Sequence, residues 1–171
     1  MAWRATRKSS AGGTAALRAH VVELLRGGHA HATFENATAK LPPALRGKRP
    51  RGAEHTAWEL VEHIRIAQRD ILDFSRNTRG RYRAPEWPAG YWPPTSAPPS
   101  RAAWTASLAA VRRDRRTIER MIADPQSDLF APFPWGDGQT LLREALLMAD
   151  HTAYHVGQLI LLRRLLGAWS S

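Results

Sequence analysis

Apolar residues recur every three or four positions along most of the chain, the spacing that places them on one face of a helix. The clearest run forms a single apolar seam of Leu60, Ile64, Ala67, Ile71 and Phe74. Before this seam, Thr56 is followed three residues later by Glu59. These two residue types at this spacing satisfy the free amides at a helix start. The pattern therefore predicts a helix from Thr56 to about Phe74.

Four further stretches carry the same helical periodicity. They are residues 14–26, a weaker stretch at 31–40, residues 100–124 and residues 140–166. A glycine or proline follows each stretch and favours its end at that point. In the last stretch, the residues after Gln158 are apolar nearly all round the helix. Such a helix end is either deeply buried or shared with a second subunit, so we expect a homodimer.

A proline-rich segment separates the helices predicted at 56–74 and 100–124. Residues 78–99 contain six prolines together with Trp87, Tyr91 and Trp92. Loops longer than about 12 to 15 residues are uncommon in compact domains unless they are functional or disordered. One interpretation is a rigid crossover that its aromatic rings fasten to the helices. The alternative is a lid formed by Trp87, Tyr91 and Trp92 over a substrate site.

No stretch alternates between apolar and polar residues as a half-buried strand does, and no repeat period is present. The expected fold is therefore all-α, a four-helix bundle with a long crossover between its second and third major helices. That crossover permits these two helices to run parallel. We expect residues 1–13 to form a basic, flexible N-terminus and residues 14–171 to form one bundle domain.

The formal net charge of +10 suggests nucleic-acid binding until it is divided along the chain. Residues 1–53 carry ten Lys and Arg against two acidic residues, whereas residues 54–171 carry fifteen against thirteen. Most of the excess charge therefore lies in the first third, where a solvated terminus explains it better than contact with nucleic acid.

The composition also limits the available chemistry and the cellular context. The chain has no cysteine, which excludes disulfides, thiolate metal ligands and a cysteine nucleophile. No apolar run approaches the roughly 20 residues of a membrane span, and the first residues lack the apolar middle of a secretion signal. These features are typical of a soluble, cytoplasmic protein without a membrane partner.

The last predicted helix carries the clearest candidate chemistry. His151 and His155 are four residues apart and therefore share one helix face, with His155 on the apolar seam and His151 on its flank. A catalytic zinc-type site takes three protein ligands and keeps one position open. Among the other histidines, His63 is mid-helix beside a core seam, whereas His55 precedes the helix cap and is free to move. Paired histidines can also be ordinary polar residues of a helix surface.

The sequence motifs of the chain resemble those of the DinB-like, or YfiT-like, superfamily of metal-binding four-helix bundles. The resemblance extends over roughly residues 30–169 and rests on an ordered set of motifs. These are Glu-Leu-Val-Glu-His-Ile at 59–64 with Thr-Ala-Trp before it, Tyr-Trp-Pro at 91–93, Gly-Gln-Thr-Leu-Leu-Arg-Glu-Ala at 138–145, and Asp-His-Thr-Ala-Tyr-His-Val-Gly-Gln-Leu at 150–159.

This resemblance implies a divalent metal, commonly nickel, zinc or iron, held by one histidine of the second helix and two of the fourth. The matching positions here are His63, His151 and His155. Characterised relatives include enzymes that use low-molecular-weight thiols such as mycothiol or bacillithiol. The implied function is a metal-dependent transferase or hydrolase acting on a small molecule in detoxification or stress response. The alternatives are a non-catalytic dimeric bundle with a structural metal and a basic, nucleic-acid-associated stress protein.

Three neutral imidazoles leave a divalent metal its full charge, so a bound thiol or water would lose its proton near neutral pH. Glu59 and Asp70 flank His63 on the same predicted helix and could orient it or move a proton. The alternative, which helix surfaces favour, is that both are solvent-facing charges. Tyr154 and Gln158 either line the pocket or pack against the bundle.

Overall fold

The computed structural model describes residues 7–169 of the chain. Within this range the protein is all-helical, and the one β-type contact is an isolated bridge between Pro132 and Thr140. The elements are α1 (Arg7–Arg26), α2 (Phe34–Thr38), the 3-10 turn η1 (Pro43–Leu45), α3 (Ala57–Ser75), the 3-10 turn η2 (Ala89–Tyr91), α4 (Arg101–Ala123) and α5 (Leu141–Leu165). The predicted all-α class is confirmed.

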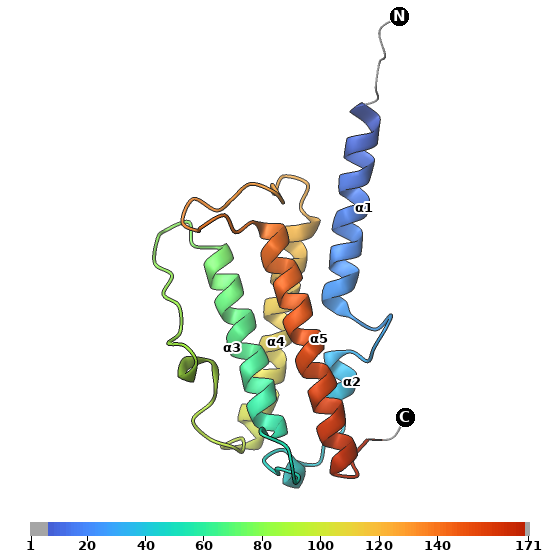
Figure 1. Cartoon of the computed structure of the whole chain (residues 1–171), viewed down its shortest axis with the longest axis vertical. Helices are drawn as coiled ribbons and strands as arrows, with labels where there is room; N and C mark the ends of the chain where they lie inside the picture. Colours follow the sequence, from blue (N-terminus) through green and yellow to red (C-terminus); the bar gives the residue numbers. More distant parts are fainter. Residues whose placement is uncertain (1–6, 170–171) are drawn as a thin grey trace, which may run out of the picture.

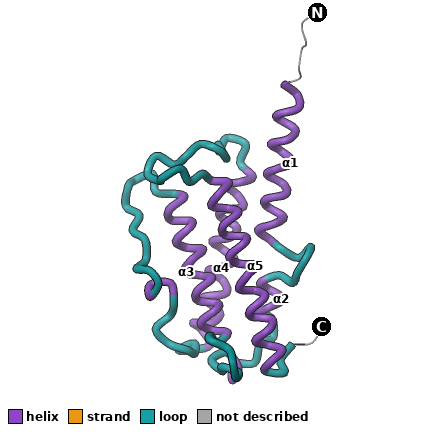
Figure 2. The backbone as a smooth tube through the Cα atoms, viewed as in Figure 1, coloured by secondary structure: helices purple, strands orange, loops and turns teal. Residues whose placement is uncertain are grey.

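The four long helices form a bundle in which α3 and α4 run in one direction and α1 and α5 run in the other (Figure 1). Both α1 and α3 pack against α4 and α5, and the short α2 packs against α5. The segment between α3 and α4 returns along the outside of α3 to the opposite end of the bundle (Figure 2). This is the predicted long crossover, and it makes α3 and α4 parallel.

Side-chain caps fix the starts of the helices. At α3, the Thr56 hydroxyl accepts from the Glu59 N–H, and the Glu59 carboxylate accepts from the Thr56 N–H. Ser100 and Thr140 accept from backbone amides in the same way at α4 and α5. Each cap satisfies an amide that lacks a partner within its helix. The predicted starts of these three helices are confirmed.

Two predicted helices have wrong boundaries. Helix α1 begins at Arg7 rather than at residue 14. Residues 7–13 have no apolar repeat, so periodicity gives no signal there, although the helix continues through them. Of the predicted flexible segment, residues 1–6 lie outside the described residues. Helix α2 covers only Phe34–Thr38 instead of residues 31–40, because Thr33 and Asn36 form a reciprocal cap that begins the helix at Phe34.

The interior contains two apolar clusters. One gathers Phe34, Ala37, Leu41, Ala57, Trp58, Leu60, Val61, Ile64, Trp104, Val111, Val156, Leu159 and Leu162. The other gathers Val21, Leu25, Ile71, Leu72, Ile118, Ile122, Leu129, Leu141, Ala145, Met148 and Ala149. Between them along α3 and α5, the buried Gln68 amide donates to the Thr152 hydroxyl at 3.0 Å. The facing sides of α3 and α5 therefore carry polar groups as well as apolar ones.

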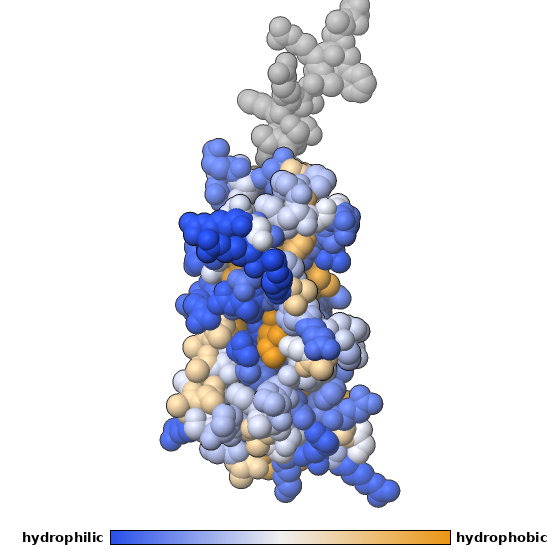
Figure 3. Space-filling view, turned by 90° about the vertical axis from the view of Figure 1, so that its left-hand side faces the viewer, coloured by the Kyte–Doolittle hydropathy of each residue, from blue (hydrophilic) through white to orange (hydrophobic). Residues whose placement is uncertain are grey.

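The surface on the crossover side is mostly hydrophilic, with small apolar areas between the charged side chains (Figure 3). None of the helices in residues 7–169 is long and apolar enough to cross a membrane.

Candidate metal centre

Three histidines from two helices converge at one point of the bundle. His63 lies on α3, and His151 and His155 lie one turn apart on α5. One ring nitrogen from each lies within 4.8 Å of the other two, and the Nε2 atoms of His63 and His151 are 3.0 Å apart. His155 is buried and His151 is partly buried, as their seam and flank positions predicted, and His63, which was predicted beside a core seam, is buried as well. The structure thus brings together the three positions that the resemblance indicated.

In two of these rings the Nδ1 atom, here called the outer nitrogen, is hydrogen-bonded to an oxygen acceptor. His63 Nδ1 donates to the backbone carbonyl of Tyr91 at 2.8 Å. His155 Nδ1 donates to Oε1 of Gln158 at 2.7 Å. Because a neutral imidazole carries one proton, a donating Nδ1 leaves a lone pair on Nε2. Such bonds fix the ring and its tautomer in metal-binding histidines.

His151 completes a set of nitrogens that fits a cation. Its Nδ1 is buried and has no hydrogen-bond partner in the described part of the chain, while its Nε2 faces the Nε2 lone pair of His63. At 3.0 Å these two Nε2 atoms can share one proton or face one cation, and the buried Nδ1 of His151 lacks a partner among the described residues in both cases. With a cation, all three histidines can offer lone pairs to one centre. Three imidazoles suit zinc, nickel or iron.

Burial keeps these histidines neutral at pH 7. It lowers the pKa of His151 to about 4, and the neighbouring His155 and His63 lower it further. Burial also lowers the pKa of His155 to about 4, against the hydrogen bond with Gln158, which raises it. The pKa of His63 is lowered as well, mainly by burial. Neutral imidazole is the form that binds a metal, so binding does not have to discharge protonated, cationic rings first.

Trp92 of the crossover forms one wall of the cluster. The His63 ring stacks on its indole with centroids 4.0 Å apart, and the His55 ring stacks on it at 3.9 Å. Two rings this close to one indole centroid must lie on opposite faces, so Trp92 is held between them. The interpretation of His55 as free to move is therefore wrong, because the stacking holds it.

The other two aromatic residues of the crossover differ in their contacts. Tyr91 reaches the cluster through its backbone carbonyl, and its hydroxyl donates to Asp70 at 2.7 Å. Trp87 is 78% exposed and meets the edge of the Tyr91 ring. The crossover thus covers His63 with Trp92 and Tyr91, while Trp87 lies at the surface.

The two acidic residues near His63 have separate partners. Asp70 accepts from the hydroxyls of Tyr82 and Tyr91, so it reaches His63 through Tyr91. Burial and this carboxylate raise the pKa of Tyr91 to about 12. Glu59 instead caps α3 at Thr56 and receives two hydrogen bonds from Arg49, each 3.0 Å long. These contacts favour a structural role for Glu59 over the orienting role considered from its spacing.

The two remaining candidates lie on α5 beside His155. Gln158 fixes the His155 ring. Tyr154 is 64% exposed, and its ring meets the His155 ring nearly at right angles with centroids 4.9 Å apart. Sequence reasoning missed the Tyr91 carbonyl and the His55 stacking. A backbone carbonyl has no residue-type signal, and only the motif at 91–93 pointed to that segment.

Comparison with known proteins agrees with this geometry. The family model of the DinB superfamily matches residues 28–159, which include all three histidines. No curated protein and no solved structure matches the chain.

Proposed function

The chain belongs to the DinB superfamily, and from this membership and its histidine cluster we propose that it is a metal-dependent enzyme. His63, His151 and His155 hold one divalent cation, either nickel, zinc or iron. The observation that carries the proposal is the arrangement of the nitrogens. The outer nitrogens of His63 and His155 are bonded to fixed acceptors, and their Nε2 lone pairs are left for a ligand.

A divalent cation bound by three neutral imidazoles keeps positions open for other ligands and lowers the pKa of a thiol or a water that occupies one of them. The chain supplies the other requirements. Tyr91 and Gln158 hold the histidine rings in one orientation, and Trp92 shields His63 from water on one side. Rings held in a fixed orientation by the protein are an example of the preorganisation that catalysis uses.

The proposed reaction is group transfer from a small electrophile to a low-molecular-weight thiol, in detoxification or stress response. The thiolate sulfur forms a bond with the electrophilic carbon, the leaving group departs with its bonding pair, and the thiol proton passes to solvent. With water as the nucleophile, the same arrangement supports hydrolysis. The thiol is a separate substrate, since the chain itself has no cysteine.

Metal content tests the site first. Protein purified without a histidine tag is expected to hold about one equivalent of divalent metal per chain, as a three-ligand site does. Elemental analysis of His63→Ala is expected to show almost none. Equal, substoichiometric metal in both proteins would remove the basis of the proposal.

Turnover tests the enzyme. Metal-loaded protein is screened against several bacterial thiols with a generic electrophile such as chlorodinitrobenzene, and release of the leaving group is followed by absorbance. Activity with at least one thiol is expected, together with its loss in His155→Ala. Tight metal binding with no turnover above the His155→Ala control would favour a structural metal instead.

A further inference from the structure

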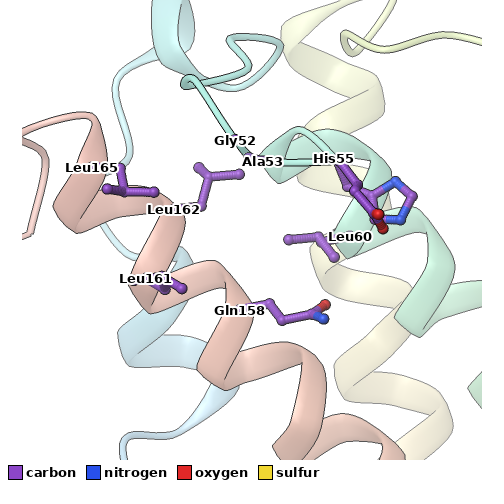
Figure 4. Close-up of a pocket in the computed structure, with 9 residues that line it drawn as sticks. Gly52, Ala53, His55, Leu60, Gln158, Leu161, Leu162 and Leu165 are labelled. Atoms are coloured by element: carbon purple, nitrogen blue, oxygen red, sulfur yellow. The ribbon is translucent and has the colours of Figure 1, made fainter.

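A cavity of about 190 Å³ opens beside the histidine cluster, between the end of α5 and the start of α3 (Figure 4). It is lined by Gly52, Ala53, Glu54, His55, Leu60, Gln158, Leu161, Leu162 and Leu165. Figure 4 shows Leu161, Leu162 and Leu165 on the α5 side, with the Gln158 amide, Leu60 and the His55 ring nearer α3. The cavity therefore has an apolar body and a polar end.

The polar end lies next to the side chains that hold the proposed metal centre. Gln158 accepts the hydrogen bond from His155 Nδ1, and His55 stacks on the indole that also stacks on His63. A molecule that touches Gln158 is thus separated from His155 by that one side chain, and a molecule that touches His55 is separated from His63 by His55 and Trp92.

The tautomer of His155 determines what Gln158 offers to this cavity. Since His155 Nδ1 donates, the amide oxygen of Gln158 must accept, and the amide NH₂ points elsewhere. Among residues 7–169 this NH₂ group has no hydrogen-bond partner, and its side chain lines the cavity. The cavity therefore presents a hydrogen-bond donor to the oxygen acceptor of a ligand.

Size and charge restrict the ligand further. An apolar cavity of roughly 150 Å³ accepts a benzene ring, so this one has room for a ring and a small substituent. The one acidic side chain of the lining, Glu54, disfavours a carboxylate ligand, and the leucines disfavour any charged body.

We propose that this cavity binds the apolar body of a small uncharged substrate, whose acceptor oxygen receives a hydrogen bond from the Gln158 amide. The inference rests on the proposed function, because it assigns the electrophilic substrate of the same centre to an uncharged aryl or short alkyl compound with a carbonyl, ether or nitro oxygen. The outer rim consists of Leu161 and Leu165, which are 57% and 56% exposed.

Three probes of similar size test the assignment on the full chain in its metal-free form: acetophenone, ethylbenzene and benzoate. Binding is measured by nuclear magnetic resonance titration of the backbone amides. Acetophenone is expected to bind about three to ten times more tightly than ethylbenzene, the net value of one hydrogen bond. Benzoate is expected to bind at least about ten times more weakly than acetophenone, because its charge must lose water.

Variants locate the binding. Leu165→Asp places a charge on the rim and is expected to weaken acetophenone binding about tenfold or more. Leu146→Asp is the matched control, since Leu146 is 42% exposed on the same helix but outside the lining, and it should bind acetophenone as the unaltered chain does. Gln158→Leu should bind acetophenone and ethylbenzene equally. Leu161→Asp provides a second rim variant if Leu165→Asp does not fold.

Equal acetophenone binding in the Leu165→Asp and Leu146→Asp proteins would overturn the assignment, as would absence of binding to the unaltered chain. A dimer in light scattering that excludes acetophenone and dissociates in Leu165→Asp would also overturn it, by showing that a second copy covers the cavity. Metal titration of the same proteins reports separately on the centre. If the chain binds metal but not the probe, only the proposed substrate site is contradicted. If it binds the probe but not metal, the proposed function is contradicted.

Discussion

Helix α5 carries two kinds of buried polar side chain, and they differ in what their polar atoms contact. Arg163 is 6% exposed, and its guanidinium donates to the carbonyls of Asn36, Ala37 and Ala168 at 2.8 to 3.2 Å. His155 and His151, about two and three turns earlier, share a site with His63. In this site Nδ1 of His63 and Nδ1 of His155 have fixed acceptors, whereas Nδ1 of His151 has none among the described residues. The guanidinium of Arg163 is paired with carbonyls of the protein, whereas the histidines leave ring nitrogens available to a ligand.

The difference separates a structural polar group from a candidate binding group. A buried polar atom costs free energy unless it is paired, so a fold normally pairs all of them. Arg163 follows this rule and joins α5 to α2. The histidine cluster departs from it, because the buried Nδ1 of His151 has no partner among the described residues and one ring nitrogen from each histidine lies within 4.8 Å of the other two. A ligand is expected where buried polar atoms lack partners in the protein.

His63→Ala is expected to give the largest effect, on metal binding. Loss of one of three ligands should weaken the affinity for zinc or nickel by more than about a hundredfold, beyond the 10- to 100-fold effect of losing a supporting residue. Calorimetric titration measures it. The Arg163→Met protein is the control and should bind metal as the unaltered chain does. Equal weakening of metal affinity in both variants would show that His63 is no more important for metal binding than Arg163.

Arg163→Met should give the largest effect on folding. Methionine keeps much of the length but none of the donors, so three carbonyls lose their partners. The expected decrease in the free energy of unfolding is about 1–3 kcal/mol, the cost of leaving buried polar groups unpaired. Urea denaturation measures it in the absence of metal. A loss in Arg163→Met no greater than in an exposed control, Arg164→Met, would mean that the guanidinium is not structural.

Asp70→Ala tests whether Asp70 helps to position His63 through Tyr91. Asp70 accepts from Tyr82 and Tyr91, and the Tyr91 carbonyl holds the His63 ring. Its loss should weaken metal affinity about tenfold, the lower end for supporting residues. Asp73→Ala is the matched control, because Asp73 lies one turn later on α3 and pairs with the partly exposed Arg69. Equal affinities of the two variants would show that Asp70 does not position His63.

Sequence patterns predicted the parts of this comparison that depend on local physics. The apolar seam and the Thr56–Glu59 cap predict α3, and a four-residue interval predicts that His151 and His155 share a face. The mid-helix position of His63 beside a core seam singled it out among the other histidines, and the resemblance indicated the same residue. The contacts that fix the rings were not predictable, because they join α3 to the carbonyl of Tyr91 and the indole of Trp92 in an irregular loop. Their positions depend on how the whole crossover packs, and no local periodicity encodes that.

The smallest expected effect concerns Glu59, one turn before His63. Burial raises the pKa of its carboxyl, but hydrogen bonds from the Thr56 N–H and from Arg49, with the charge of Arg49, lower the pKa more. The net pKa lies below its usual value, so ionised Glu59 stabilises the fold at neutral pH. This contribution is complete above the unfolded pKa of about 4.3 and is lost as the pH falls through the lower folded pKa.

Glu59→Gln keeps an acceptor for the helix cap and removes the charge, so it should cost about 0.5 to 1 kcal/mol at pH 7, as a partly exposed ion pair does. The difference from the unaltered chain should shrink as the pH falls below about 4.3, because the carboxyl then becomes neutral in both states of the unaltered chain. Urea denaturation at several pH values measures it. Metal affinity at pH 7 should not change. A tenfold loss of metal affinity, as expected for Asp70→Ala, would instead show that Glu59 helps to position the histidines of the metal site.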